Sequence, residues 1–228
     1  MTGKTHRVGG MLCVLGGFSY LESKGLLLRG VNPILQLTVM YPFALYGSIV
    51  SDLDHNANSI PSKDIVSVAI NKVLHLTSKI NDVSGCKPGI ASILDAKHRS
   101  WQTHSDLFLF ALLYALYGLI TQSKLATAES VLVSLIGMGF VLGVISHLVL
   151  DMLTPEGVWS IVLIGVGKAT KTGKIVPKKI SLVPDTSFFR TGGMWETLVR
   201  NILWGMCAVL FIRIVYLMMP YRLVFNIH

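Results

Sequence analysis

A histidine and an aspartate stand four residues apart at the end of the most apolar stretch of this chain. His147 and Asp151 belong to the segment 131–155, VLVSLIGMGFVLGVISHLVLDMLTP, which ends at Thr154 and Pro155. At positions i and i+4 of a helix, two side chains lie one above the other, close enough to hold a single metal ion. The plainer interpretation is that His147 caps the helix and that Asp151 is solvated at a membrane interface.

Side chains of the same chemical types stand at the edges of the other apolar stretches. Imidazole nitrogens and carboxylate oxygens without thiolates are typical ligands of zinc, manganese, iron or another divalent first-row ion. The set is large enough for two ions that share a bridging aspartate and generate hydroxide near neutral pH. In the Asp-Leu-Asp-His turn, either Asp54 or His55 is the second ligand. The candidate ligands are His6, Asp52, Asp54, His98, His104, His147 and Asp151.

Two more residues are candidates for catalysis. Arg99 follows His98, and its planar guanidinium donates to phosphate or carboxylate through two parallel bonds, so we expect it to steady the negative charge of a substrate. Glu196 opens the last apolar stretch and is a further ligand or a base for water. Taken singly, His6 is interpreted as a surface residue, and Glu196 as a helix N-terminal charge favoured by the macrodipole.

The composition is that of an integral membrane protein. Of 228 residues, 52% are hydrophobic and only 14% are charged, whereas soluble domains are typically about 25% charged. Apolar stretches of about 20 residues span the roughly 30 Å of a bilayer core. We therefore expect an all-α polytopic membrane protein, a single integral-membrane domain over residues 1–228 with about five transmembrane helices. The expected spans are residues 6–21, 31–50, 107–122, 131–150 and 198–219.

The segments between these spans are expected to hold smaller elements. Residues 56–105 form a loop that contains an amphipathic helix, DIVSVAINKVLHLTSKI, at 64–80. Residues 158–184 are β-branched and punctuated by glycine, which predicts a small β-hairpin lying on the cytoplasmic face of the membrane.

Alternating helix direction predicts that the polar residues meet on one side of the membrane. With five crossings, the starts of the first, third and fifth spans and the ends of the second and fourth share that side. Most lysines and arginines also lie there, so the positive-inside rule places this side in the cytoplasm. The net charge of +8 is explained in this way, and no nucleic-acid partner is expected. Five of the seven histidines are brought together: His6, His55, His98, His104 and His147.

As an ordered set, these motifs resemble the YdjM-like family of bacterial membrane-bound, metal-dependent hydrolases. The matching pieces are Thr5-His6 before a glycine-rich helix, the Asp-Leu-Asp-His turn, His98-Arg99 with Thr103-His104-Ser105, His147 to Gly157, and Thr191 to Glu196. The resemblance implies a hydrolase integral to the bacterial inner membrane. The inventory of residue types is also similar to that of zinc-dependent phospholipases C, an analogy that favours phosphoester cleavage.

We therefore expect a membrane-bound hydrolase that uses zinc or manganese at the cytoplasmic membrane face. Its expected substrate is a phosphoester of a membrane lipid or of a lipid-linked molecule. The alternative is a metal-binding transporter or sensor without catalysis, which predicts ligands near the bilayer midplane, whereas the candidates here cluster at helix ends. A third possibility is a structural membrane protein whose polar residues only form hydrogen bonds.

Overall fold

The computed structural model describes residues 1–28, 30–54, 64–83, 103–122, 127–160, 178–184, 188 and 191–224. Within these residues the chain is mostly helical, with one pair of short strands. The elements in chain order are α1 (Gly3–Ser23), α2 (Pro33–Val50), the 3-10 helix η1 (Ser51–Asp54), α3 (Ile65–Val83), α5 (Asp106–Gln122), α6 (Ala128–Met152), β1 (Val158–Ser160), β2 (Lys178–Ile180) and α7 (Met194–Val224).

Local capping explains where several helices begin. The side chain of Asn32 accepts a hydrogen bond from the Ile34 amide at 2.8 Å, just ahead of the proline that opens α2. Thr127 forms a capping box with Ser130 at the start of α6. Ser105 Oγ accepts from the Phe108 amide at 3.2 Å and caps α5. These caps satisfy backbone donors that a helix leaves unpaired at its first turn.

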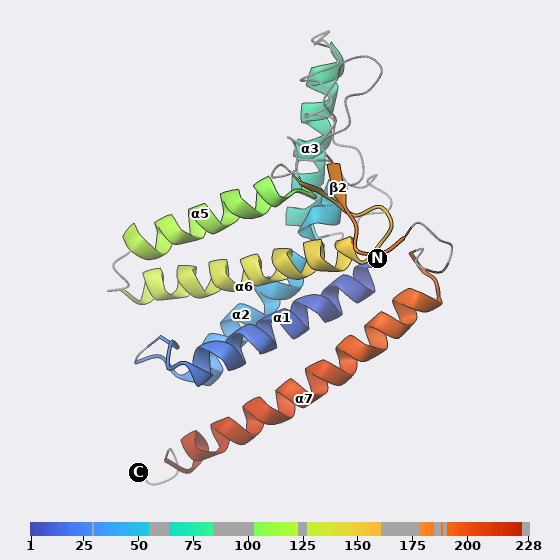
Figure 1. Cartoon of the computed structure of the whole chain (residues 1–228). Helices are drawn as coiled ribbons and strands as arrows, with labels where there is room; N and C mark the ends of the chain where they lie inside the picture. Colours follow the sequence, from blue (N-terminus) through green and yellow to red (C-terminus); the bar gives the residue numbers. More distant parts are fainter. Residues whose placement is uncertain are drawn as a thin grey trace.

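Five helices form a bundle with roughly aligned axes. Figure 1 shows α1, α2, α5, α6 and α7 running in alternating directions, so that the starts of α1, α5 and α7 and the ends of α2 and α6 meet at one end. The N-terminus lies at that end and the C-terminus at the other. This is the arrangement expected from alternating helix direction, and it gathers the polar residues at one end of the bundle.

The contact between α2 and α6 depends on glycine. A Cβ atom added at Gly139 would overlap the carbonyl oxygen of Met40, and one added at Gly143 would overlap that of Ala44. Small residues of this kind let two helix backbones approach closely within a membrane. Because His147 stands one turn beyond Gly143, the close approach brings its ring against the backbone of α2.

In the part of the chain that the structure describes, three helices are long and apolar enough to cross a membrane: Pro33–Leu53, Ala128–Met152 and Met194–Met218. The expected count of five spans is therefore not confirmed. α5 is apolar but shorter, at 17 residues. α1 has sufficient length at 21 residues, but Lys4, His6 and Arg7 make its first two turns polar and its glycines add little hydrophobicity.

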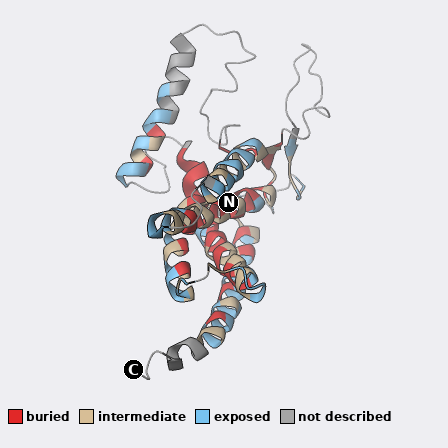
Figure 2. Cartoon of the chain, turned by 90° about the vertical axis from the view of Figure 1, so that its left-hand side faces the viewer, coloured by how far each residue is buried: buried red, intermediate tan, exposed pale blue. Residues whose placement is uncertain are grey.

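The smaller elements predicted from the sequence are also present. β1 pairs with β2 in antiparallel fashion, with Val158 opposite Ile180, which confirms the hairpin; its location on the cytoplasmic face stays a prediction. The amphipathic segment forms α3, which projects crosswise from the end of the bundle (Figure 1). Figure 2 shows that buried residues concentrate in the bundle, whereas α3 is largely exposed where its burial is described.

Candidate metal centre

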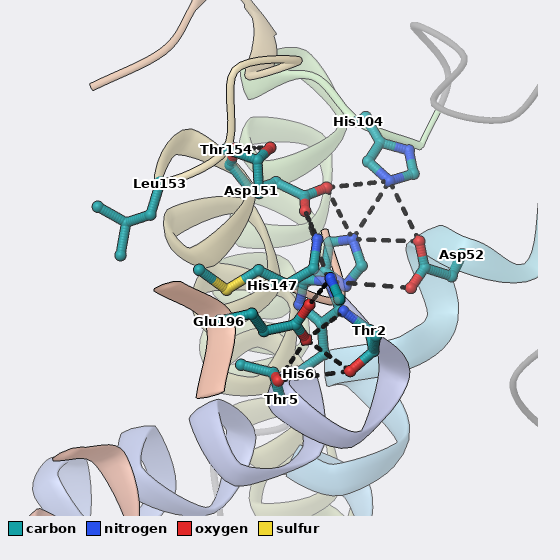
Figure 3. Close-up of polar contacts among 12 residues, drawn as sticks. Thr2, Thr5, His6, Asp52, His104, His147, Asp151, Leu153, Thr154 and Glu196 are labelled. Carbon is teal, nitrogen blue, oxygen red and sulfur yellow. Dashed lines mark hydrogen bonds and ion pairs between the residues drawn. The ribbon is translucent and has the colours of Figure 1, made fainter. Parts of the chain in front are cut away.

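Five of the predicted ligands lie together at the shared end of the bundle (Figure 3). His6 comes from the first turns of α1, Asp52 from η1, His104 from the residues before α5, and His147 and Asp151 from the last turns of α6. Asp52 is 7% exposed and the other four are fully buried. The interpretations of His6 as a surface residue and of Asp151 as a solvated one are therefore wrong.

Two imidazoles and two carboxylates form one compact group of donors. The Nε2 atoms of His104 and His147 are 3.2 Å apart, and they lie 3.4 and 3.3 Å from Asp151 Oδ2. Asp52 Oδ1 lies 3.6 Å from the first of these nitrogens and 3.8 Å from the second. Ligand atoms bound about 2.1 Å from a tetrahedral ion are about 3.4 Å from one another. The observed separations therefore fit the edges of a coordination shell.

His6 faces the opposite oxygen of each carboxylate. Its Nε2 lies 3.4 Å from Asp151 Oδ1 and 3.9 Å from Asp52 Oδ2, and its ring stacks on that of His147 with centroids 3.9 Å apart. Two groups of donors can thus be drawn, His6 with His147 and Asp151, and Asp52 with His104 and His147. Each carboxylate has one oxygen on either side, which is the arrangement of a bridging ligand.

The hydrogen bonds behind the rings orient the histidines. His147 Nδ1 lies 2.7 Å from the carbonyl oxygen of Ser48. Because a carbonyl only accepts, Nδ1 carries the proton in the neutral ring, and the lone pair of Nε2 points at the carboxylates. His104 Nδ1 lies 3.0 Å from Thr103 Oγ1. Partners of this kind fix the orientation of metal-binding histidines.

The electrostatics of the cluster fit a bound cation. Among the described residues, His6 Nδ1 has no hydrogen-bond partner, and Nε2 has only the ion-pair contacts with the two carboxylates; a buried polar atom without a partner costs about 1–3 kcal/mol. Asp52 and Asp151 bring two buried carboxylates to the same space, which is unfavourable without positive charge nearby. The ammonium group of Met1 lies 3.3 Å from Asp151 Oδ1. The cluster is therefore able to hold a metal ion, which would bind the lone pair of His6 and offset the carboxylate charge.

Glu196 lies beside the cluster and contacts the start of α1 instead (Figure 3). Its Oε1 accepts hydrogen bonds from the Thr2 amide at 2.6 Å and from the hydroxyls of Thr2 and Thr5. Its Oε2 accepts from the Gly192 amide at 2.6 Å. Since Thr5 immediately precedes His6, this carboxylate ties α7 to the turn that carries His6.

The structure does not test the roles predicted for the other site residues. Asp54 is the last residue of η1. His55, His98 and Arg99 lie outside the described residues. Their assignments as ligands or as a substrate-binding residue therefore stay predictions.

Sequence reasoning missed the residues that support the ligands. Ser48 contributes its backbone carbonyl, and the type of a residue does not predict a backbone contact. Thr2 and Thr5 are ordinary helix-start residues by type, and only their contact with Glu196 gives them a role at the site. The order Thr103-His104-Ser105 did contain a usable signal, since a hydroxyl next to a histidine can bond to its ring.

Comparison with known proteins gives a match along nearly the whole chain. The family model described as YdjM inner membrane protein matches residues 1–222. No curated protein and no solved structure matches the chain.

Proposed function

Because the chain belongs to the YdjM inner membrane protein family, we propose that it is a membrane-embedded, metal-dependent hydrolase that cleaves a phosphoester. The observation that carries the proposal is the convergence of three imidazole Nε2 atoms and two carboxylates from four separate elements. Helix packing alone does not require so many buried titratable groups, because each is costly to remove from water. A bound metal ion would offset that cost.

The donor set favours zinc or manganese, since it mixes nitrogen and oxygen and lacks thiolate. Two ions would be accommodated if both aspartates bridge, with His104 and His147 on one side and His6 on the other. A divalent ion supplies Lewis acidity and makes water acidic enough to act as hydroxide near neutral pH.

The protein's own residues have separate tasks in this proposal. Asp52 retains the most exposure of the five ligands, so we expect the phosphoester to approach from its side. Arg99 would steady the phosphate charge. Glu196 is occupied by its hydroxyl and amide partners, which supports a role in positioning His6 ahead of a role as a base for water.

An apolar cavity supports a lipid or lipid-linked substrate. It has a volume of about 480 Å³ and is lined by residues of α1, α2 and α7, among them Met11, Leu15, Tyr41 and Trp204. Small-molecule sites typically have volumes of about 300–1,000 Å³. At a rise of about 1.5 Å per residue, Met11 and Leu15 lie about 8 and 14 Å beyond His6 along α1. A hydrocarbon chain in this cavity would extend from a headgroup near the metal centre.

The test combines metal analysis with hydrolysis assays on detergent-purified protein. We expect at least one equivalent of zinc or manganese by mass spectrometry, and hydrolysis of dioleoyl phosphatidic acid or of bis(p-nitrophenyl) phosphate. Chelation should abolish the hydrolysis, and added zinc or manganese should restore it. Asp151→Asn should lose both metal and activity. Glu129→Gln, on the exposed first turn of the same helix, should lose neither.

Two results would contradict the proposal in different ways. Protein purified without chelator that carries less than one equivalent of any transition metal would exclude the metal centre. Protein that holds metal through Asp151 but hydrolyses neither compound would favour the alternative, a metal-binding sensor or transporter. The complete burial of His6, His104 and His147 is the observation in favour of that alternative. A site that only binds an ion does not have to admit a phosphoester substrate. Ion uptake into proteoliposomes would then separate a transporter from a sensor.

A further inference from the structure

One face of α3 exposes a continuous apolar stripe. With 3.6 residues per turn, positions 65, 66, 69, 73 and 76 fall within an arc of roughly 100°. The large side chains in this arc are highly exposed, and the opposite face is buried at Ser67 and Asn71. The exposed fractions are 88% for Ile65, 57% for Val66, 60% for Val73 and 56% for Leu76.

The buried face fixes α3 at the level where a candidate span ends. Asn71 Nδ2 donates to the carbonyl oxygen of Leu53 at 2.6 Å, and Ser67 Oγ lies 3.2 Å from the Tyr46 hydroxyl. Leu53 is the last residue of the span Pro33–Leu53. The contact of Asn71 therefore ties α3 to the end of this span, and the contact of Ser67 ties it to α2 two turns earlier.

The direction of α3 is also that of a helix lying along a membrane surface. In Figure 1 the helix runs crosswise to the bundle, so it lies along the plane of a membrane that the aligned helices cross. Figure 2 shows exposed residues along the described part of α3.

We propose that α3 is an interfacial helix whose apolar stripe rests in the headgroup region of the bilayer that holds the bundle. Amphipathic helices in this position bury their apolar face about 5–10 Å into the boundary between headgroups and acyl chains. The exposed Lys72 borders the stripe and keeps its charge at the polar level while its methylene groups cover apolar surface. Since Leu53 follows Asp52, the lipid contact of α3 also steadies the backbone that carries a metal ligand. The proposal depends on the inner-membrane family assignment and not on hydrolysis.

Spin labels on the full chain in lipid vesicles test the proposal. Single cysteines would replace Val66 and Val73 in a chain whose native cysteines are changed to alanine, and collision of each label with oxygen and with a water-soluble nickel chelate would be measured. Val209, 67% exposed in the middle of the α7 span, is the lipid control, and the exposed Glu156 is the aqueous control. We expect an oxygen-to-nickel collision ratio several-fold above that of Glu156 and below that of Val209.

Two outcomes would overturn the interfacial assignment. A ratio equal to that of Glu156 at both positions would mean that the stripe faces water. Poor collision with both reagents would mean that another segment or a second copy of the chain covers the stripe. A variant that fails to reconstitute would be recognised because it does not float with the vesicles in a density gradient, and labels at Ile65 and Leu76 on the same stripe would then replace those at Val66 and Val73.

Discussion

At the scale of single residues, the candidate metal centre depends on atoms that orient its histidines as much as on the donor residues themselves. His147 is held by a backbone carbonyl and His104 by the neighbouring hydroxyl of Thr103. A backbone carbonyl cannot be removed by substitution, but a side-chain hydroxyl can. The pair Thr103 and His104 is therefore the place to measure what orientation contributes.

Thr103→Val should weaken metal binding about 10–100-fold, the usual effect of removing a partner behind a metal-binding histidine. Valine keeps the branched shape of threonine and loses only the hydroxyl that lies 3.0 Å from His104 Nδ1. Competition against a chromophoric zinc chelator would measure the change. Thr103→Ser, which retains the hydroxyl, is the matched control and should bind as the unmodified protein does. Equal affinity in all three would mean that the hydroxyl does not orient the ring.

At the scale of elements, the centre is assembled by how closely α2 and α6 approach each other. The backbone of α6 at Gly143 lies against Ala44 and Ser48 of α2, and His147 reaches the Ser48 carbonyl one turn later. A larger residue at Gly143 would separate the two helices at the point where the ligand is oriented.

Gly143→Ala should destabilise the protein by about 1–3 kcal/mol, the typical cost of overpacking a well-packed contact. It should also weaken zinc binding, because the separation of the helices removes the support for His147. Thermal unfolding in detergent and the same chelator competition would measure the two effects. Gly205→Ala on α7 is the control, since a Cβ atom there meets nothing within 4 Å. If Gly143→Ala changes neither the stability nor the zinc affinity, the close approach of α2 and α6 at this position does not support the site.

At the scale of the whole molecule, a bound ion would link elements that are far apart in sequence. An ion that binds only the folded chain stabilises it by about 2.7 kcal/mol at 100 times its dissociation constant. Protons compete with the ion for imidazole nitrogens, so this stabilisation should be present near pH 7.5 and should decline toward pH 5.

We expect zinc to raise the unfolding temperature of the chelated protein at pH 7.5 by several degrees, and to raise it much less at pH 5. Differential scanning fluorimetry in detergent measures the difference between the zinc-treated and chelated samples. Asp151→Asn should remove the zinc effect at both values of pH. An equal shift in that variant would place zinc elsewhere on the protein.

Alternating helix direction allowed much of this site to be predicted from the sequence. The residue types and their positions at the ends of the expected helices were enough to predict that five residues lie together: His6, Asp52, His104, His147 and Asp151. The number of spans was harder to predict, because hydrophobic length alone does not separate a polar-ended helix such as α1 from a complete crossing.

The hydrogen-bond partners of the site residues were also hard to predict from the sequence. Glu196 was recognised by its type and position, but its contacts with Thr2 and Thr5 depend on how α7 lies against α1. The support of His147 by Ser48 likewise depends on the distance between two backbones, which follows from glycine packing rather than from any polar motif. Contacts of this kind arise from tertiary packing and leave no pattern along the chain.

The ligands also appear in a definite order when the chain is synthesised. His6 leaves the ribosome first, yet its donor partners Asp52 and Asp151 follow only when α2 and α6 have been made. A nascent chain that stops before α6 lacks two of the five donors, including the carboxylate nearest to all three histidines. Metal loading would consequently be a late step of biogenesis, and a tightly held ion would mark those copies whose insertion is complete.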